Sequence, residues 1–372
     1  CFFCVRIRRP PGHTKGGSAA GSDVYKSQGD VCPLAAYNWL KYTGEFGEEG
    51  ECVAFIDMGA STTDIVIERG NQFRFARPLS IGGDTITEGI SKAFGMSFPE
   101  AERLAHFKTF IQREDLEQIA SWGMDHVRLP VDSSTLEDDA SPCLYKEHGL
   151  AFVDQCLEWC RAAGLAVILD LHKAPGFAFD DLQSASLFQE PALQERLLNL
   201  WDALARRYQG QASYLAFEPL NEIVLPDSGP WNVLMPKIVQ RIRASNPSRI
   251  IVVGGNRYNS ASELINLKLL DDPNLLYTFH CYAPHIFTHQ KAPWVPAIFT
   301  YNQAVEYPGE CTNLAEFLAS PQAAQFTNEE LDFLLRTYLG QPLDKASIQA
   351  ALQPALDFRQ HSRHAVYCLY LI

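Results

Sequence analysis

The sequence predicts an α/β protein whose larger part is an incomplete (β/α)8 TIM barrel. From His126 onward, short runs rich in β-branched residues alternate with amphipathic segments of helical period, which is typical of parallel βα units. Polar residues follow several of these runs directly, as expected where the carboxyl ends of barrel strands form a common rim. A chain of 372 residues is long enough for a barrel and a smaller first part.

The first thirty residues show no pattern of a folded element. Gly, Ser, Pro and Lys dominate residues 9–31, and no hydrophobic period is present, so we expect residues 1–30 to be loop or disordered. The chain begins with Cys1 and has no basic region leading into a long apolar stretch, so no intact signal peptide is predicted. The localisation is left open.

The segment of residues 31–105 has the pattern of a strand hairpin followed by helices. Strands are expected over Cys52–Asp57 and Asp64–Ile67, and helices are expected near residues 84–93 and from Pro99. The turn Asp57-x-Gly59-x-x-Thr62-Thr63 and its surroundings resemble the actin-like ATPase of type IV pilus assembly, the PilM type. That resemblance implies an actin-like fragment whose turn holds a nucleotide phosphate through backbone N–H groups and hydroxyls.

The barrel part is expected over residues 106–372. Its strands are predicted over five apolar runs: His126–Val131, Ala166–Leu171, Tyr214–Leu220, Arg249–Val253 and Leu276–His280. Helices are predicted between them over three amphipathic segments: Leu150–Ala163, Pro191–Tyr208 and Trp231–Ala244. A sixth strand is expected over Ala365–Cys368.

Polar residues gather at the carboxyl ends of these strands. They are Arg128, His172, Asn221, Glu222, His280 and Tyr282. One polar residue at a strand end is often a solvated loop residue, but several strands that each deliver at least one favour a common site.

The segments around these residues resemble glycoside hydrolase family 5, the cellulase-like retaining glycosidases, in order and spacing. The resemblance implies that Glu222 is the general acid/base and that Asn221 hydrogen-bonds the sugar 2-hydroxyl. It also implies that His280 contacts the acid/base, that Arg128 and Tyr282 orient the nucleophile, and that His172 lines the glycone subsite. Trp231, Trp294 and Tyr301 are candidates for stacking on sugar rings, or equally for partly buried loop anchors.

A retaining glycosidase needs a second carboxyl group about 5 Å from the first. In the family that residue is the Glu of a Gly-Glu-Phe-Gly motif ending the seventh strand, and here Tyr370 stands at its place, so we expect the nucleophile to be missing. The first and eighth strands are also expected to be absent. Glu45, in the one Gly-Glu-Phe-Gly run of the sequence, is an alternative nucleophile in a circularly permuted barrel.

Charge, apolar runs and cysteine spacing each disfavour a class of binding partner. The formal net charge of -13 disfavours nucleic acid, and no apolar run is long enough to span a membrane. Cys1 and Cys4 form the only CxxC pair, without a second pair at metal-site spacing, so neither a metal nor a cofactor is predicted. The oligomeric state is left open.

The predicted function is therefore a retaining endo-β-1,4-glucanase-like glycoside hydrolase acting on a β-glucan or cello-oligosaccharide. Two alternatives remain. One is an oligosaccharide-binding remnant without catalysis, and the other is an actin-like nucleotide-binding or pilus-assembly fragment.

Overall fold

The structure of this chain is a computed structural model that describes most residues after position 51. The described ranges are 2–7, 52–58, 63–69, 72–79, 83–95, 97–181, 185–211, 213–311, 313–362 and 364–371. The expected loop over residues 9–31, the alternative nucleophile Glu45 and the turn residues 59–62 lie outside them. The chain divides into two compact units, residues 1–112 and 113–372, so the boundary falls after Gln112, a few residues beyond the predicted one.

The first unit contains a four-stranded antiparallel sheet and two helices. The strands follow one another in the order β1 (Phe2–Ile7), β2 (Cys52–Met58), β3 (Thr63–Arg69) and β4 (Gln72–Leu79). The helices are α2 (Gly83–Phe94) and α3 (Phe98–Thr109). The predicted hairpin and helices are confirmed. The prediction of loop or disorder was wrong for Phe2–Ile7, because this apolar, β-branched and aromatic run pairs along its whole length with β2.

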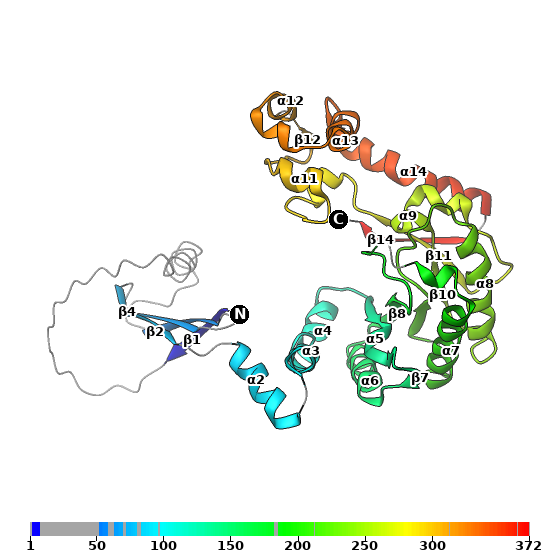
Figure 1. The fold of residues 1–372 in the computed structure, drawn as a ribbon, viewed down its shortest axis with the longest axis horizontal. Helices are drawn as coiled ribbons and strands as arrows, with labels where there is room; N and C mark the ends of the chain where they lie inside the picture. The colour runs from blue at the N-terminus through cyan, green and yellow to red at the C-terminus, as the bar shows by residue number, and fades with distance from the viewer. Residues whose placement is uncertain are drawn as a thin grey trace. The chain divides into compact units, whose positions relative to one another are not determined.

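The second unit is built on a six-stranded parallel sheet (Figure 1). Its strands, in spatial order, are β14 (Ala365–Leu371), β11 (Leu275–Cys281), β10 (Ile251–Gly254), β9 (Leu215–Glu218), β8 (Ala166–Lys173) and β5 (His126–Asp132). All six predicted strands are present, and sequential strands are neighbours in the sheet. This arrangement is that of an incomplete (β/α) barrel.

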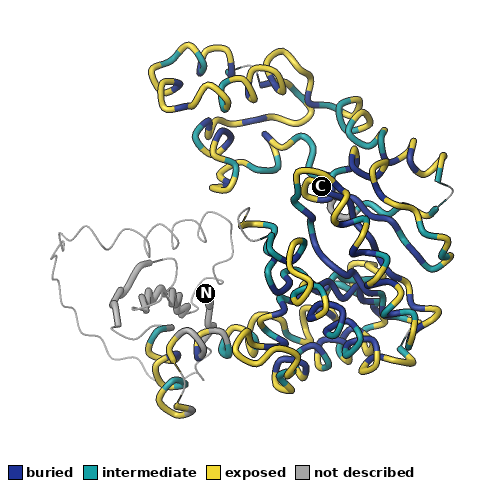
Figure 2. The backbone as a smooth tube through the Cα atoms, turned by 45° about the vertical axis from the view of Figure 1, so that its right-hand side comes forward, coloured by how far each residue is buried: buried dark blue, intermediate teal, exposed yellow. Residues whose placement is uncertain are grey.

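Helices connect and cover the strands. They are α4 (Arg113–Ser121), α6 (Glu147–Ala162), α7 (Pro191–Arg207), α8 (Gly229–Arg243) and α14 (Lys345–Ser362). Short elements lie between them: α5 (Ser133–Leu136), β6 (Glu137–Asp138), β7 (Ser141–Tyr145) and α9 (Asn256–Asn259), with 3-10 turns over Ser186–Phe188 and Ala261–Asn266. One core joins the inner faces of α6, α7 and α8 to the strands, and Figure 2 shows the strands buried and the outer helix faces exposed.

The segment between β11 and α14 forms a small core of its own. Its elements are α10 (His285–Thr288), α11 (Pro296–Tyr301), β12 (Gly309–Glu310), α12 (Leu314–Leu318), a 3-10 turn over Pro321–Gln325, α13 (Asn328–Tyr338) and β13 (Pro342–Leu343). Ile298, Leu314 and Leu334 are buried at its centre. None of the described helices is long and apolar enough to cross a membrane.

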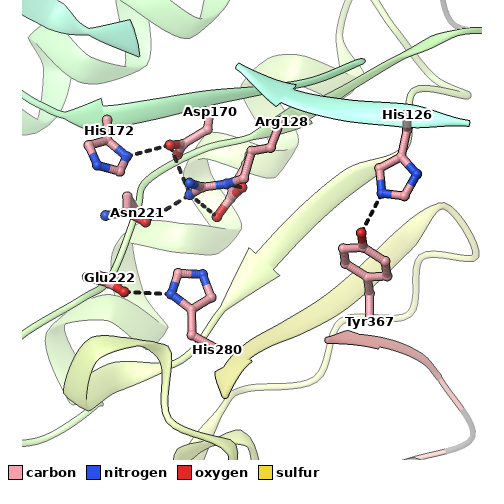
Figure 3. A network of polar contacts seen from close by, with 9 residues as sticks. His126, Arg128, Asp170, His172, Asn221, Glu222, His280 and Tyr367 are labelled. Carbon is pink, nitrogen blue, oxygen red and sulfur yellow. Dashed lines mark hydrogen bonds and ion pairs between the residues drawn. The ribbon is translucent and has the colours of Figure 1, made fainter. Parts of the chain in front are cut away.

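The two edge strands of the six-stranded sheet approach each other across its concave side. The His126 imidazole of β5 is hydrogen-bonded through Nε2 to the hydroxyl of Tyr367 in β14 (Figure 3). β5 and β14 are at opposite ends of the strand order, so this contact requires the sheet to curl strongly. His126 is the first residue of β5 and Tyr367 the third of β14, so the contact lies toward the amino ends of the two edge strands.

Candidate active site

Arg128 of β5 is the centre of a buried polar network at the strand ends (Figure 3). Its Nε donates to Glu218 Oε2 at 2.6 Å and its Nη2 donates to Glu218 Oε1 at 2.9 Å, which is a bidentate pair. The same Nη2 also donates to Asn221 Oδ1 at 2.8 Å and contacts Asp170 Oδ2 at 2.9 Å. One guanidinium from β5 therefore holds side chains from β8, from β9 and from the loop after β9 in fixed orientation.

Asp170 and Glu218 are two buried carboxyl groups that share this single cation. Their residues are 0% and 1% exposed. Burial and the charge of Asp170 raise the pKa of Glu218 from the ordinary value of 4.5 to about 7, against the opposing effect of Arg128. Burial likewise raises the pKa of Asp170, although His172 and Arg128 oppose that shift. Burial therefore makes both carboxyl groups harder to ionise than ordinary carboxyl groups, and Arg128 opposes this for each of them.

His172 connects this buried network to the rim. Its Nδ1 lies 2.7 Å from Asp170 Oδ2, and its ring packs edge-on against Phe179 with centroids 5.0 Å apart. The side chain of His172 is 26% exposed, whereas Asp170 below it is fully buried. Asp170 therefore orients the imidazole from its buried side, and the rest of the ring is partly accessible to solvent.

Glu222 and His280 form a second pair at the strand ends. His280 Nδ1 lies 2.6 Å from Glu222 Oε1, and the two side chains are 2% and 13% exposed respectively. Glu222 has a φ of 36°, in the left-handed region that residues with a Cβ rarely adopt. The result is a carboxyl group next to an imidazole, partly open to solvent, immediately beside Asn221.

Aromatic residues extend the site beyond His280. The ring of Tyr282 is edge-on to that of His280, with centroids 6.4 Å apart, and to that of His289, with centroids 5.3 Å apart. Trp294 is edge-on to His289 at 6.5 Å and is 75% exposed. Trp294 therefore has a free face on which a sugar ring can stack.

The two other aromatic candidates for sugar stacking were wrong. Trp231 lies in α8, is 0% exposed, and donates from Nε1 to Gly254 O at 3.0 Å. Tyr301 is 1% exposed in the core of the segment between β11 and α14, and its hydroxyl donates to Asn313 Oδ1. Both satisfy their polar atoms inside the protein, so their apolar surface stabilises the fold.

Tyr370 lies near the carboxyl end of β14. β14 pairs with β11 so that His280 is opposite Leu369 and Cys281 is opposite Leu371, and the register shifts between these two pairs. The backbone of Tyr370 therefore lies between the levels of His280 and Cys281 in the sheet. Four of the six strands, β5, β8, β9 and β11, contribute the polar residues of the site.

Asp170 and Glu218 are the site residues that the sequence analysis did not identify. Each is a carboxylic acid within an otherwise apolar strand, Asp170 in β8 and Glu218 at the end of β9. A charge inside a buried run requires a partner, and this signal was available in the sequence.

The described residues contain no group of three or more His, Cys, Asp or Glu placed to hold a metal ion. The residues of the polar site can transfer protons and form hydrogen bonds. Glu222 can give or take a proton at the rim, Asn221 and His172 can bond hydroxyl groups, and Trp294 offers an apolar face. A neutral polyhydroxylated ligand suits this combination.

Comparison with known proteins identifies the family. The family model for Cellulase (glycosyl hydrolase family 5) matches residues 85–333. Endoglucanase C of Acetivibrio thermocellus and Endoglucanase C307 of Clostridium sp. strain F1 are each 42% identical over 263 residues, which is 71% of this chain and 74% of the relative. A solved structure described as a glycoside hydrolase superposes with a TM-score of 0.54 at 22% identity, covering 69% of this chain and 71% of the other.

A second family model, that of the type IV pilus assembly protein PilM, matches residues 39–115 and overlaps the start of the first match. The cellulase match covers most of the chain and includes every residue of the polar site described above. The chain belongs to the cellulases of glycosyl hydrolase family 5, enzymes that cleave O-glycosidic bonds.

Proposed function

We propose that this chain acts on β-1,4-glucans or cello-oligosaccharides at the rim of the six-stranded sheet, with Glu222 as the general acid/base. The observation that carries the proposal is the Glu222–His280 pair, 2.6 Å apart and partly open to solvent beside Asn221. Two relatives named endoglucanase, each 42% identical to this chain, support the substrate class.

Glu222 has the surroundings that proton transfer to a leaving oxygen requires. A general acid must reach the oxygen that it protonates, and the carboxyl group of Glu222 is 13% exposed at the strand ends. His280 Nδ1 bonds one carboxyl oxygen and fixes the plane of the group. The other oxygen, Oε2, is then the one directed to substrate.

Asn221 is oriented for a hydroxyl group of the sugar. Its Oδ1 accepts from Arg128 Nη2, so its Nδ2 is the donor that remains for a ligand. Among the described residues, the buried Nδ2 of Asn221 is one of the few side-chain atoms without a hydrogen-bond partner inside the protein. This supports the role of Asn221 as the residue that bonds the 2-hydroxyl, with Arg128 as its support. His172 is placed to line the glycone subsite.

Among the catalytic groups, the nucleophile is the hardest to assign to a described residue of the site. Asp170 and Glu218 are carboxyl groups in the network, but both are buried against Arg128 and closed to an anomeric carbon. Tyr370 follows Leu369 at the level of His280, and a phenol does not replace a carboxylate in the glycosyl intermediate. Turnover by retention therefore requires a carboxylate from elsewhere.

The decisive experiment uses an aryl cellobioside with an activated leaving group, with and without azide. We expect Glu222→Gln to reduce hydrolysis of unactivated cello-oligosaccharides by about 10²-fold or more, because the proton donor is lost. Glu195→Gln, a change to an exposed glutamate of α7, is the matched control and should be neutral. If only azide restores turnover, the nucleophile is missing from the chain. Equal rates for Glu222→Gln and the parent chain on unactivated cello-oligosaccharides contradict the assigned role.

The alternative is an oligosaccharide-binding protein without catalysis. The placement of Asn221, His172 and Trp294 supports this function equally, since none of them transfers a proton. Calorimetry with cello-oligosaccharides distinguishes the two functions: heat of binding with no product after prolonged incubation supports the binding protein.

A second candidate function concerns the first unit. The match of residues 39–115 to the PilM family favours an actin-like fragment that binds a nucleotide phosphate at the turn between β2 and β3. Limited proteolysis with and without ATP and magnesium tests it. Unchanged cleavage of residues 31–105 in the presence of nucleotide contradicts this function.

A further inference from the structure

The loop after β10 contains an unusual left-handed turn next to the proposed acid/base. Arg257, Tyr258 and Asn259, which form most of α9, have φ values of 50°, 58° and 58°. Three successive residues with side chains in this region are strained, because each Cβ crowds the backbone. Such a turn persists only where surrounding contacts impose it, and its contacts therefore indicate its purpose.

The first contacts of the turn are to the segment that follows Glu222. The Asn256 side chain bonds both backbone groups of Leu225: its Oδ1 accepts from Leu225 N at 2.8 Å and its Nδ2 donates to Leu225 O at 2.9 Å. In addition, Tyr258 N donates to Ile223 O at 3.2 Å. Three hydrogen bonds thus fix Ile223, which directly follows Glu222, and Leu225.

The other end of the turn contacts the strand of His280. Ser260 forms a parallel bridge with His280, and Gly254 at the end of β10 is paired with Thr278 two residues earlier in β11. β10 lies between β9, which precedes Glu222, and β11, which carries His280. The turn therefore spans the space between the two partners of the acid/base pair.

The interior of the turn is closed. Asn256 and Asn259 are each 1% exposed, and Asn259 Oδ1 accepts from Gly255 N at 2.8 Å. By contrast, the side chains between them point outward, since Tyr258 is 48% exposed and the Arg257 side chain is 69% exposed. The buried Asn256 and Asn259 therefore hold the turn from inside, whereas the side chains of Arg257 and Tyr258 lie at the surface.

We propose that the Asn256–Ser260 turn positions the proposed acid/base, with Asn256 as the positioning residue that fixes Glu222 against His280. Glu222 itself has a left-handed φ of 36° and needs an external restraint to remain there. Asn256 supplies it from one side through Leu225, and the bridge at Ser260 fixes His280 from the other. This inference deepens the proposed function, because it explains what maintains the 2.6 Å contact.

The chain contains a matched control for Asn256. Asn232 of α8 also bonds both kinds of backbone group in a distant segment: its Nδ2 donates to Asn266 O at 2.8 Å and its Oδ1 accepts from Lys268 N at 2.7 Å. Asn232→Ala therefore removes two bonds of the same kinds as Asn256→Ala without releasing the segment of Glu222.

Amide hydrogen exchange tests the proposal independently of activity. In Asn256→Ala we expect the amides of Leu225 and Tyr258 to exchange about tenfold faster or more, as expected when two hydrogen bonds of the turn are lost. In Asn232→Ala the amide of Lys268 should exchange faster while Leu225 and Tyr258 do not change. Unchanged exchange of Leu225 and Tyr258 in Asn256→Ala overturns the proposal, whether or not the chain hydrolyses glucans.

Leaving-group dependence tests the link to catalysis. A displaced general acid slows substrates with poor leaving groups most, so Asn256→Ala should lower kcat/KM for cellotetraose at least tenfold more than for a dinitrophenyl cellobioside. An equal loss on both substrates shows a general structural defect and overturns the positioning role. If Asn256→Ala does not fold, Asn256→Asp retains the acceptor for Leu225 N, and the same split with a smaller loss is expected. Failure of the parent chain to hydrolyse either substrate refutes the proposed function, and the exchange measurement then decides the positioning role alone.

Discussion

Glu222 Oε1 lies 2.6 Å from His280 Nδ1, although the two residues are separated by 58 positions and by an intervening strand. β9 and β11 do not pair with each other, so the contact depends on the curl of the sheet and on the path of the loops after β9 and β10. The distance is therefore a sensitive measure of how well the strand ends are assembled.

Removal of the Arg128 guanidinium should destabilise the second unit. Arg128→Ala leaves Asp170 and Glu218 buried without their cation, and breaking such a pair costs about 3–5 kcal/mol. The measurement is the free energy of unfolding in urea at pH 7. Arg206→Ala, which removes an exposed ion pair with Asp202 on α7, is the control and should cost less than about 1 kcal/mol. Equal effects of the two changes refute the central role of Arg128.

The raised pKa of Glu218 has a consequence for stability. Because the folded state holds this proton more tightly than the unfolded state, the contribution of Glu218 is complete below pH 4.5 and is lost as the pH rises through about 7. Glu218→Gln retains hydrogen-bonding atoms without the charge, so its stability should decline less between pH 4.5 and 7 than that of the parent chain. Parallel stability curves over this range would show that Glu218 does not titrate there.

The exposed and buried tryptophans should respond oppositely to truncation. Trp294→Ala should weaken binding of cello-oligosaccharides by about 2–10-fold, since a stacking contact is worth about 0.5–1.5 kcal/mol, and should leave the unfolding free energy nearly unchanged. Trp231→Ala should destabilise the unit by about 3–5 kcal/mol, because it empties a fully buried site. Calorimetric binding and thermal unfolding of both variants provide the test. Normal affinity in Trp294→Ala argues against a sugar on that ring.

Adjacent glycines at the end of β10 should differ in their tolerance of a methyl group. A Cβ at Gly254 would lie 2.6 Å from three side-chain atoms of Asn259, whereas a Cβ at Gly255 would meet its nearest neighbour, Glu263, at 3.4 Å. Gly254→Ala is therefore expected to cost about 1–3 kcal/mol and Gly255→Ala less than about 1 kcal/mol in unfolding free energy. The reverse order would mean that Asn259 does not fill the space against Gly254.

The sequence predicted the sheet well because each strand is a local apolar run with clear ends. The polar residues at those ends could also be predicted, since parallel strands bring their carboxyl ends together whatever the loops do. Arg128, His172, Asn221, Glu222 and His280 were found in this way, and the structure brings all five to the same end of the sheet.

Tertiary contacts decide the features that were not predicted. The burial of Trp231 depends on the carbonyl of Gly254, which is close in space and distant in sequence. The left-handed turn at Arg257–Asn259 contains no glycine, so local propensity argues against it, and bonds from Asn256 and Asn259 impose it. The segment between β11 and α14 has short elements without a regular period, and its fold rests on its own small core.

The hydrogen bond between His126 and Tyr367 joins residues 241 positions apart. Contacts of such long sequence separation form late, because the intervening chain must first be ordered. During synthesis the concave side of the sheet stays open until β14 has left the ribosome, and the growing chain carries an unpaired edge at β11 until that moment. Slow production at low temperature, or a chaperone that shields strand edges, should therefore raise the yield of correctly folded protein.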